Sequence, residues 1–187
     1  MDTATAVLRK EHEAIVKMLE VTEEVARRLE AGEHVAVETL ADLLEFLRLF
    51  ADKCHHGKEE DLLFPRLEKK GMPRAGGPIA VMLAEHEQGR ALIKQMAEAT
   101  DTYPRRPQKA GPAWAEAARG YASLLRGHIS KENHVLFVLA ERMLTPAEQV
   151  ELAESFEKIE VEKMGAGTHA RLHAMMGKLI KEILPAP

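Results

Sequence analysis

Two ten-residue stretches of this 187-residue chain, 73 positions apart, share one pattern of histidine, acidic and apolar residues. The first reads His55-His56-Gly57-Lys58-Glu59-Glu60-Asp61-Leu62-Leu63-Phe64, and the second reads His128-Ile129-Ser130-Lys131-Glu132-Asn133-His134-Val135-Leu136-Phe137. Each places a glutamate four residues after a histidine, a spacing that brings both side chains to one face of an α-helix. A shorter match relates Glu11-His12-Glu13 to Glu85-His86-Glu87. The chain therefore indicates two related halves, each with one helix that carries an inward histidine and one that carries a histidine and a glutamate.

Apolar residues recur every three or four positions through almost the whole sequence, which predicts helices and requires no β-strand. The predicted helices span residues 2–31, 35–70, 78–100, 113–144, 145–164 and 168–184. In the fourth of these, Val135, Leu139 and Met143 continue the inward face beyond Glu132. We therefore expect an all-α fold, an antiparallel up-down four-helix bundle over residues 1–144 with a C-terminal helical extension over residues 145–187 packed on it.

Local signals mark where these helices begin and end. Asp2 or Thr3 can cap the first helix, and Pro65 is expected to kink or end the second. Residues 101–112 contain three prolines and are predicted to form an exposed connection. Thr145-Pro146-Ala147-Glu148 is a capping box with proline at the first helical position, so a new helix is predicted to start there.

The composition narrows the classes of protein that the chain fits. Hydrophobic residues make up 45% and aromatic residues only 4%, which favours helices packed on helices over a β-sandwich. A net charge of −4 argues against nucleic acid as a partner. No apolar run reaches the roughly 18 residues that a membrane-spanning helix needs. One cysteine, Cys54, and an N-terminus without the features of a signal peptide lead us to expect a cytoplasmic protein.

Polar residues interrupt the apolar face of all four long helices. These residues are His12, His55, Glu59, His86, His128 and Glu132. Burying two carboxylates and four imidazoles in an apolar bundle costs several kcal/mol for each charge when nothing opposes it. A multivalent cation removes this cost because it supplies positive charge and accepts the lone pairs. The pattern therefore predicts a metal site at the centre of the bundle.

The number of donors suits a pair of ions. Two metals about 3.5–4 Å apart, with about six donors each, need roughly twelve donor positions. Four imidazoles, two bridging glutamates and a bridging oxygen leave about two positions open to a small ligand. Nitrogen and carboxylate donors without cysteine favour iron or manganese over a closed structural zinc site. A mononuclear zinc or iron site is the alternative, but it leaves at least two of the buried polar groups unexplained.

The ordered set of four motifs resembles the hemerythrin-like, HHE cation-binding family over roughly residues 5–142. The motifs are His12 and His86, each within Glu-His-Glu, His55-His56-Gly57-Lys58-Glu59-Glu60 followed by Leu63-Phe64-Pro65, and His128-x-x-Lys131-Glu132-Asn133. The resemblance implies an antiparallel four-helix bundle that holds a non-heme di-iron centre, oxo- or hydroxo-bridged, with manganese or zinc less favoured. Carried over position by position, the implied metal ligands are His12, His55, Glu59, His86, His128 and Glu132.

Two departures from the oxygen carriers of this family limit the resemblance. Those proteins have a second histidine four residues after the one in the third helix, where this chain has Arg90. They also have an aspartate five residues after the last histidine. This chain has Asn133 at that position, and its acidic residue, Glu132, comes four residues after His128. The chain thus resembles the branch associated with oxygen, nitric oxide or iron sensing, peroxide handling and iron–sulfur cluster repair. Arg90 is expected either near the open coordination position or at the edge of the apolar face.

Several other residues are candidates for supporting roles. His56 and Glu60 could replace His55 and Glu59 as ligands, although the internal repeat favours the latter pair. Otherwise His56 and Glu60 would add a ligand, orient a ligand or lie at the surface. His169 and His173 could add ligands or close the mouth of the bundle, or could simply pack on it. His34 and His134 are expected at the surface, and Cys54 is expected to be a small buried residue facing away from the metal.

We expect a protein that binds or senses a small molecule, O2, NO or peroxide, at an open position of the metal centre. Peroxide decomposition, iron donation in cluster repair and metal-dependent signalling are the alternatives. No catalytic residue is assigned, and the residues leave open whether a substrate is turned over. No nucleic acid or membrane partner is expected, and no protein partner is identified.

Overall fold

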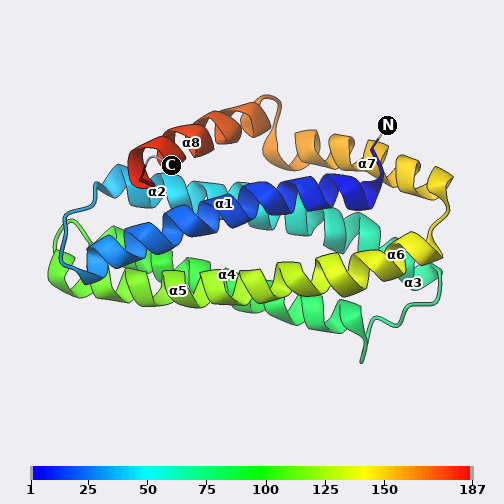
Figure 1. The fold of residues 1–187 in the computed structure, drawn as a ribbon, viewed down its shortest axis with the longest axis horizontal. Coiled ribbons are helices and arrows are strands. Elements are labelled where there is room, and N and C mark those ends of the chain that lie inside the picture. The colour runs from blue at the N-terminus through cyan, green and yellow to red at the C-terminus, as the bar shows by residue number, and fades with distance from the viewer. Residues whose placement is uncertain (1, 186–187) are drawn as a thin grey trace.

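The computed structural model describes residues 2–185, so the domain limits drawn at residues 1 and 187 lie outside the described range. Four long helices run antiparallel along one another (Figure 1). The first is α1 (Ala4–Glu30), and the third is α4 (Pro78–Thr102). The second joins α2 (Val37–Phe46), η1 (Leu47–His56), η2 (Glu59–Leu63) and α3 (Phe64–Lys69). The fourth joins α5 (Pro107–Lys131), η3 (Glu132–Leu136) and α6 (Phe137–Met143). The all-α bundle predicted from the sequence is confirmed.

Two C-terminal helices, α7 (Pro146–Met164) and α8 (Thr168–Ile183), lie across one side of the bundle. They contact α1 and the second long helix, and Figure 1 shows them on the side away from α4 and α5. Leu172, Leu179 and Ile183 of α8 are buried in the core cluster that contains most of α1. Phe156 of α7 is buried in a second core cluster, near the other end of the bundle. The C-terminal helices thus cover the bundle surface formed by α1 and η1.

The helices that carry the repeated histidine–glutamate motif are π-helical around that motif. η2 and η3 occupy equivalent positions in the two halves of the chain. In the second long helix, η1 extends the π-helical region back to Leu47. A π turn contains one residue more than an α turn, and such turns are frequent at functional sites. The π-helical segments therefore change which residues point inward in the part of each helix that follows them.

This change of register corrects one prediction. Continuing α-helical spacing beyond Glu132 placed Val135, Leu139 and Met143 on the inward face. In the structure Val135 is 48% exposed, and Leu139 and Met143 are partly buried against the core, while Leu136 and Ala140 are fully buried. The extra residue of the π turn shifts the inward positions by one.

One prediction based on proline is also wrong in detail. The connection predicted over residues 101–112 is much shorter, because Pro107 occupies the first turn of α5 and Pro112 lies inside that helix. Proline is well tolerated in a first turn, since the amide it lacks would have no helical partner there. Of the two outcomes expected at Pro65, a kink or an end of the helix, the end does not occur: the second helix continues to Lys69, close to the predicted bound, because Pro65 too falls in the first turn of a helical segment, α3.

A buried polar layer divides the apolar core of the bundle. One cluster surrounds Phe46, Trp114 and Tyr121, and the other surrounds Leu8, Phe64 and Phe137. On α1 these clusters are separated at Glu11 and His12, which are buried between Leu8 and Ile15. Among residues 2–185, no helix combines the length and the apolar character needed to cross a lipid bilayer.

The capping box at the start of α7 gives a test of how the C-terminal helices are held. The Thr145 hydroxyl accepts a hydrogen bond from the Glu148 amide, and the Glu148 carboxylate accepts one from the Thr145 amide. We expect Thr145→Ala to lower the free energy of unfolding by about 1 kcal/mol in urea denaturation. The control is Ser155→Ala within the same helix, which should change it by less than about 0.5 kcal/mol. Equal effects would contradict the assigned cap.

Candidate metal centre

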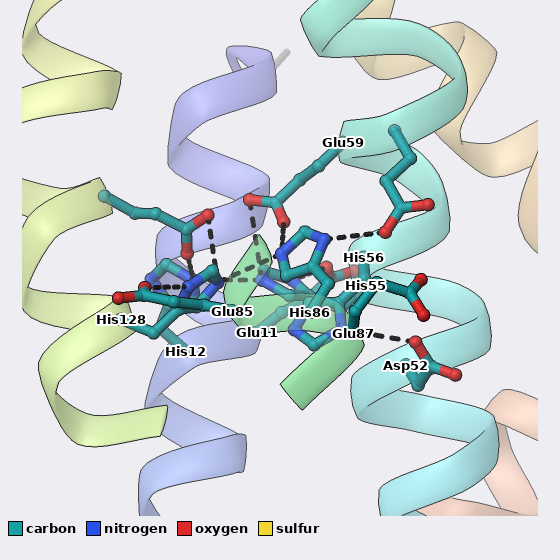
Figure 2. A network of polar contacts seen from close by, with 12 residues as sticks. Glu11, His12, Asp52, His55, His56, Glu59, Glu85, His86, Glu87 and His128 are labelled. Carbon is teal, nitrogen blue, oxygen red and sulfur yellow. Dashed lines mark hydrogen bonds and ion pairs between the residues drawn. The ribbon is translucent and has the colours of Figure 1, made fainter. Parts of the chain in front are cut away.

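Two pairs of buried histidines face each other in the polar layer. Nε2 of His12 lies 2.9 Å from Nε2 of His55, and Nε2 of His86 lies 3.1 Å from Nε2 of His128. Each of these four residues is 1% exposed. One histidine comes from each long helix, and Figure 2 shows the imidazoles converging between the helices. The structure thus brings together all four histidines that interrupt the predicted apolar faces.

Glu59 and Glu132 span the two histidine pairs. The carboxylate of Glu132 places one oxygen 3.1 Å from Nε2 of His12 and the other 3.2 Å from Nε2 of His128. The carboxylate of Glu59 places one oxygen 3.7 Å from Nε2 of His55 and the other 3.5 Å from Nε2 of His86. Both glutamates are fully buried. Each carboxylate therefore presents one oxygen to each pair, which is the arrangement of a bridging ligand.

The outer nitrogen of every paired imidazole has a fixed hydrogen-bond acceptor. The Nδ1 atoms of His12, His55, His86 and His128 lie 3.0, 2.8, 2.6 and 3.0 Å from oxygens of Asn133, Glu11, Glu60 and Glu85, respectively. Carboxylate oxygens and the amide oxygen of Asn133 only accept hydrogen bonds, so the proton of each neutral ring sits on Nδ1. The lone pair of each Nε2 then points toward the centre of the bundle. An acceptor behind the imidazole is the usual support of a metal-binding histidine.

This arrangement fits a bound cation and is costly without one. In each histidine pair two Nε2 lone pairs meet at close to 3 Å. The four carboxylate oxygens of Glu59 and Glu132 are buried and make no hydrogen bond among the described residues. Buried polar atoms without partners cost several kcal/mol, and a metal ion satisfies nitrogens and carboxylate oxygens together. The donor set, of imidazole nitrogens and carboxylate oxygens without thiolate, suits iron, manganese or zinc.

The structure adds a fifth imidazole to this centre. His56 is buried and stacks on His86, with 3.8 Å between the ring centroids. Ligand atoms of His56, Glu59, His86 and His128 lie within 4.8 Å of one another, and so do those of His12, His55, Glu59 and Glu132. Consecutive residues point about 100° apart in an α-helix and less far apart in the wider π-helix, so His55 and His56 can both face inward from η1.

The choice between two ligand pairs in the second helix therefore has a mixed outcome. His55, Glu59 and His56 all reach the centre, whereas Glu60 lies behind it as the acceptor for Nδ1 of His86. The sequence predicts that His56 either replaces His55 or serves as an additional or supporting group, and α-helical geometry gives no reason to favour both residues facing inward. The clustered π turns supply that reason.

Arg90 holds the acidic residues behind His56 and His86. Its guanidinium donates hydrogen bonds to Asp52 at 2.8 Å and to Glu60 at 2.7 Å. Asp52 in turn lies 3.4 Å from Nδ1 of His56. Arg90 thus supports two imidazoles from outside the centre.

Burial dominates the electrostatics of the centre. It lowers the pKa of His55 to about 4 and the pKa of His56 well below its usual value, so both rings are neutral and able to bind a metal. Burial, together with repulsion from Glu132, raises the pKa of Glu59 well above its ordinary range. Burial also disfavours the charge on Glu132, but His128 and His12 outweigh it and the pKa of Glu132 is lowered. The two facing carboxylates repel each other unless positive charge lies between them.

The halves of the chain share a second layer of contacts that sequence reasoning did not identify. Glu11 connects His55 to Lys58, and Glu85 connects His128 to Lys131 in the same way. The repeated Glu-His-Glu motif contained the signal for these glutamates, but their role as acceptors requires knowing which helix each one faces. The environments differ, because Lys58 is 1% exposed beneath α7 and the Lys131 side chain is 44% exposed.

The remaining candidate residues lie away from the centre. His169 and His173 are on α8 and pack against Phe50, and they belong to neither of the two groups of converging ligand atoms at the centre. His34 and His134 are exposed, as the sequence predicts. Cys54 is buried with its thiol 3.9 Å from the Glu160 carboxylate, and burial raises the pKa of that thiol to about 12.

A helical bundle with a histidine- and glutamate-lined centre defines a class of metal-binding protein. Within that class, the model of the hemerythrin HHE cation-binding domain matches residues 3–140. The chain belongs to this family, which confirms the resemblance inferred from the motifs. A metal centre is therefore expected from the family as well as from the geometry.

The chain is also similar to several bacterial proteins. It is 27% identical over 163 residues to uncharacterized proteins of Mycobacterium tuberculosis and Mycobacterium bovis, covering 87% of this chain and 63% of each relative. It is 37% identical over 86 residues to the iron–sulfur cluster repair protein YtfE of Enterobacter sp., covering 44% of this chain and 39% of that protein. The chain thus spans less than two thirds of these relatives. No solved structure matches it.

The repulsion between Glu59 and Glu132 yields a test in metal-free protein. We expect Glu59→Gln to raise the free energy of unfolding of the metal-free protein at neutral pH by about 1–4 kcal/mol, because it removes a buried charge. Because the pKa of Glu59 is raised, the folded protein binds a proton more readily than the unfolded chain does. Lowering the pH through that pKa therefore stabilises the unsubstituted protein, and the gain from the substitution shrinks.

Urea unfolding of metal-free protein between pH 5 and pH 8 measures this effect. The control is Glu13→Gln, at an exposed position of α1 next to the site, which should leave stability nearly unchanged. A destabilised Glu59→Gln protein in the absence of metal would contradict the assigned repulsion.

Proposed function

We propose that this protein holds two non-heme iron ions between its long helices and binds a small molecule, O2, NO or peroxide, at a remaining coordination position. The observation that carries this proposal is that both glutamates divide their oxygens between two histidine pairs. A mononuclear site would have no use for two such carboxylates. Each ion would be held by two paired histidines and one oxygen from each glutamate, with His56 added on the side of His86 and His128.

The number of donors supports a centre that is not closed. Five imidazoles and two bridging carboxylates provide nine of the roughly twelve positions that two six-coordinate ions need. A bridging oxo or hydroxo group provides two more, which leaves about one position for an exogenous ligand. The donor count made from the sequence left two open coordination positions because it did not include His56. Paired iron ions in such a site supply redox-active Lewis acids for a small oxygen- or nitrogen-containing ligand.

The surrounding residues favour selective binding of small neutral molecules. Apolar core lies on both sides of the polar layer, and Phe137 stacks on His12 with 5.4 Å between the ring centroids. Such packing limits the access of bulk water and of large ligands. The acceptors on Nδ1 make the paired imidazoles stronger donors and hold their orientation.

Iron donation in iron–sulfur cluster repair is the second candidate function. It is favoured by the similarity to YtfE proteins, which are named for this repair, over 44% of the chain. The two functions differ in the fate of the iron. Restoration of a damaged iron–sulfur enzyme with loss of iron from this protein would support donation, and reversible binding of NO or O2 with full retention of iron would support sensing.

The proposal predicts about two iron ions per chain after anaerobic reconstitution, measured by metal analysis. His55→Ala, Glu59→Ala, His128→Ala and Glu132→Ala should each lose most of the metal, because each removes a direct donor. His56→Ala should retain iron but bind it more weakly, since the bridging carboxylates and two histidines of its ion remain. His34→Ala, at an exposed histidine, should lose none. Equal iron content across the series would contradict the assigned ligands.

A further inference from the structure

A second group of histidine and acidic side chains lies where the C-terminal helices cover the bundle. A cavity of about 530 Å³ separates α7 and α8 from α1 and η1. His169 and His173 of α8 line it together with Glu160 of α7. All three residues lie beyond residues 3–140, which the family model matches. This group therefore needs an explanation apart from the centre between the long helices.

The two histidines form a converging pair on one face of α8. They are one helical turn apart, and their ring centroids are 4.5 Å from each other. Both rings pack on Phe50, each with its centroid 5.6 Å from that of the phenyl ring. Neither imidazole has a hydrogen-bond partner within the described part of the chain, so their nitrogens are available. Histidines four residues apart on one helical face can bind a single metal ion together.

Glu160 is held so that one carboxylate oxygen faces His169. Lys58 donates a hydrogen bond to Oε2 of Glu160 at 2.9 Å, and this lysine is 1% exposed. Oε1 of Glu160 lies 3.9 Å from Nδ1 of His169. Two donors bound to one transition-metal ion at about 2.1 Å each are separated by somewhat more than 3 Å, so a small adjustment suffices to place an ion between them.

The charge around the cavity favours a cation. Five carboxylates and two lysines line it, so it is negative overall while its histidines are neutral. Two imidazole nitrogens and one carboxylate oxygen, with open positions for water, are donors typical of divalent transition metals such as Fe²⁺, Co²⁺ and Zn²⁺. Ca²⁺ and Mg²⁺ prefer sites made of oxygen donors. The donor set thus selects one chemical class of ligand.

We propose that His169, His173 and Glu160 form a mononuclear site for a divalent transition-metal ion, separate from the centre between the long helices. The two sites are connected through buried side chains, because Lys58 contacts both Glu160 and Glu11, and Glu11 accepts a hydrogen bond from His55. The mononuclear site lies at the outer end of this chain of contacts. The equivalent contacts of the other half end at Lys131, whose side chain is 44% exposed.

Equilibrium dialysis of the iron-loaded full-length protein against Co²⁺, followed by metal analysis, tests this site. The starting iron content is measured first, so a failure of the iron centre is detected independently of cobalt binding. We expect the unsubstituted protein to bind about one Co²⁺ per chain in addition to its iron. His173→Ala should weaken that binding at least about tenfold, since it removes a direct donor, and should leave the iron content unchanged.

Matched variants separate the site from general surface binding. His34→Ala removes an exposed histidine far from the cavity, and Glu162→Gln removes an exposed carboxylate of α7 that does not line it. Both should bind Co²⁺ like the unsubstituted protein, whereas Glu160→Gln should bind it more weakly. Circular dichroism verifies that each variant is folded. Equal Co²⁺ binding by the unsubstituted protein and the His173→Ala variant would overturn the proposal. Failure of the iron-loaded unsubstituted protein to bind any Co²⁺ would also overturn it.

Discussion

The convergence of lone pairs at the centre of the bundle is the constraint on which the rest of the structure depends. Four imidazoles are oriented by acceptors on their outer nitrogens, so their inner nitrogens present lone pairs to one another. Two buried carboxylates add negative charge at the same place. The apolar clusters on either side provide no compensating partner. Positive charge at this point makes the arrangement stable, and the donors determine which ions are suitable.

The two halves of the chain build this centre in the same way and then differ at a few positions. His56 has Ile129 as its counterpart in the repeat, so the fifth imidazole belongs to one half alone. Glu60, which supports His86, corresponds to Asn133, which supports His12. Burial of Lys58 under α7 gives the first half a contact with the C-terminal helices that the second half lacks. A nearly symmetric frame therefore gives the two histidine pairs different surroundings.

The sequence predicted the parts of the fold that follow from helical periodicity and from strong local signals. The four long helices, the capping box at Thr145 and the convergence of six polar groups all follow from spacing alone. The inward position of His56 and the exposure of Val135 could not be predicted, because each depends on π turns that α-helical spacing does not reveal. Glu11 accepts a hydrogen bond from His55, and Lys58 contacts Glu160; both contacts connect residues that are far apart in the chain. Their pairing depends on how the helices pack.

X-ray absorption spectroscopy at the iron edge, on protein reconstituted with iron, tests the central claim most directly. The account predicts scattering from mixed nitrogen and oxygen donors and a second iron atom about 3.5–4 Å from the first, or somewhat closer with a single-atom bridge. A spectrum without an iron neighbour, from protein that holds a single iron per chain, would contradict it.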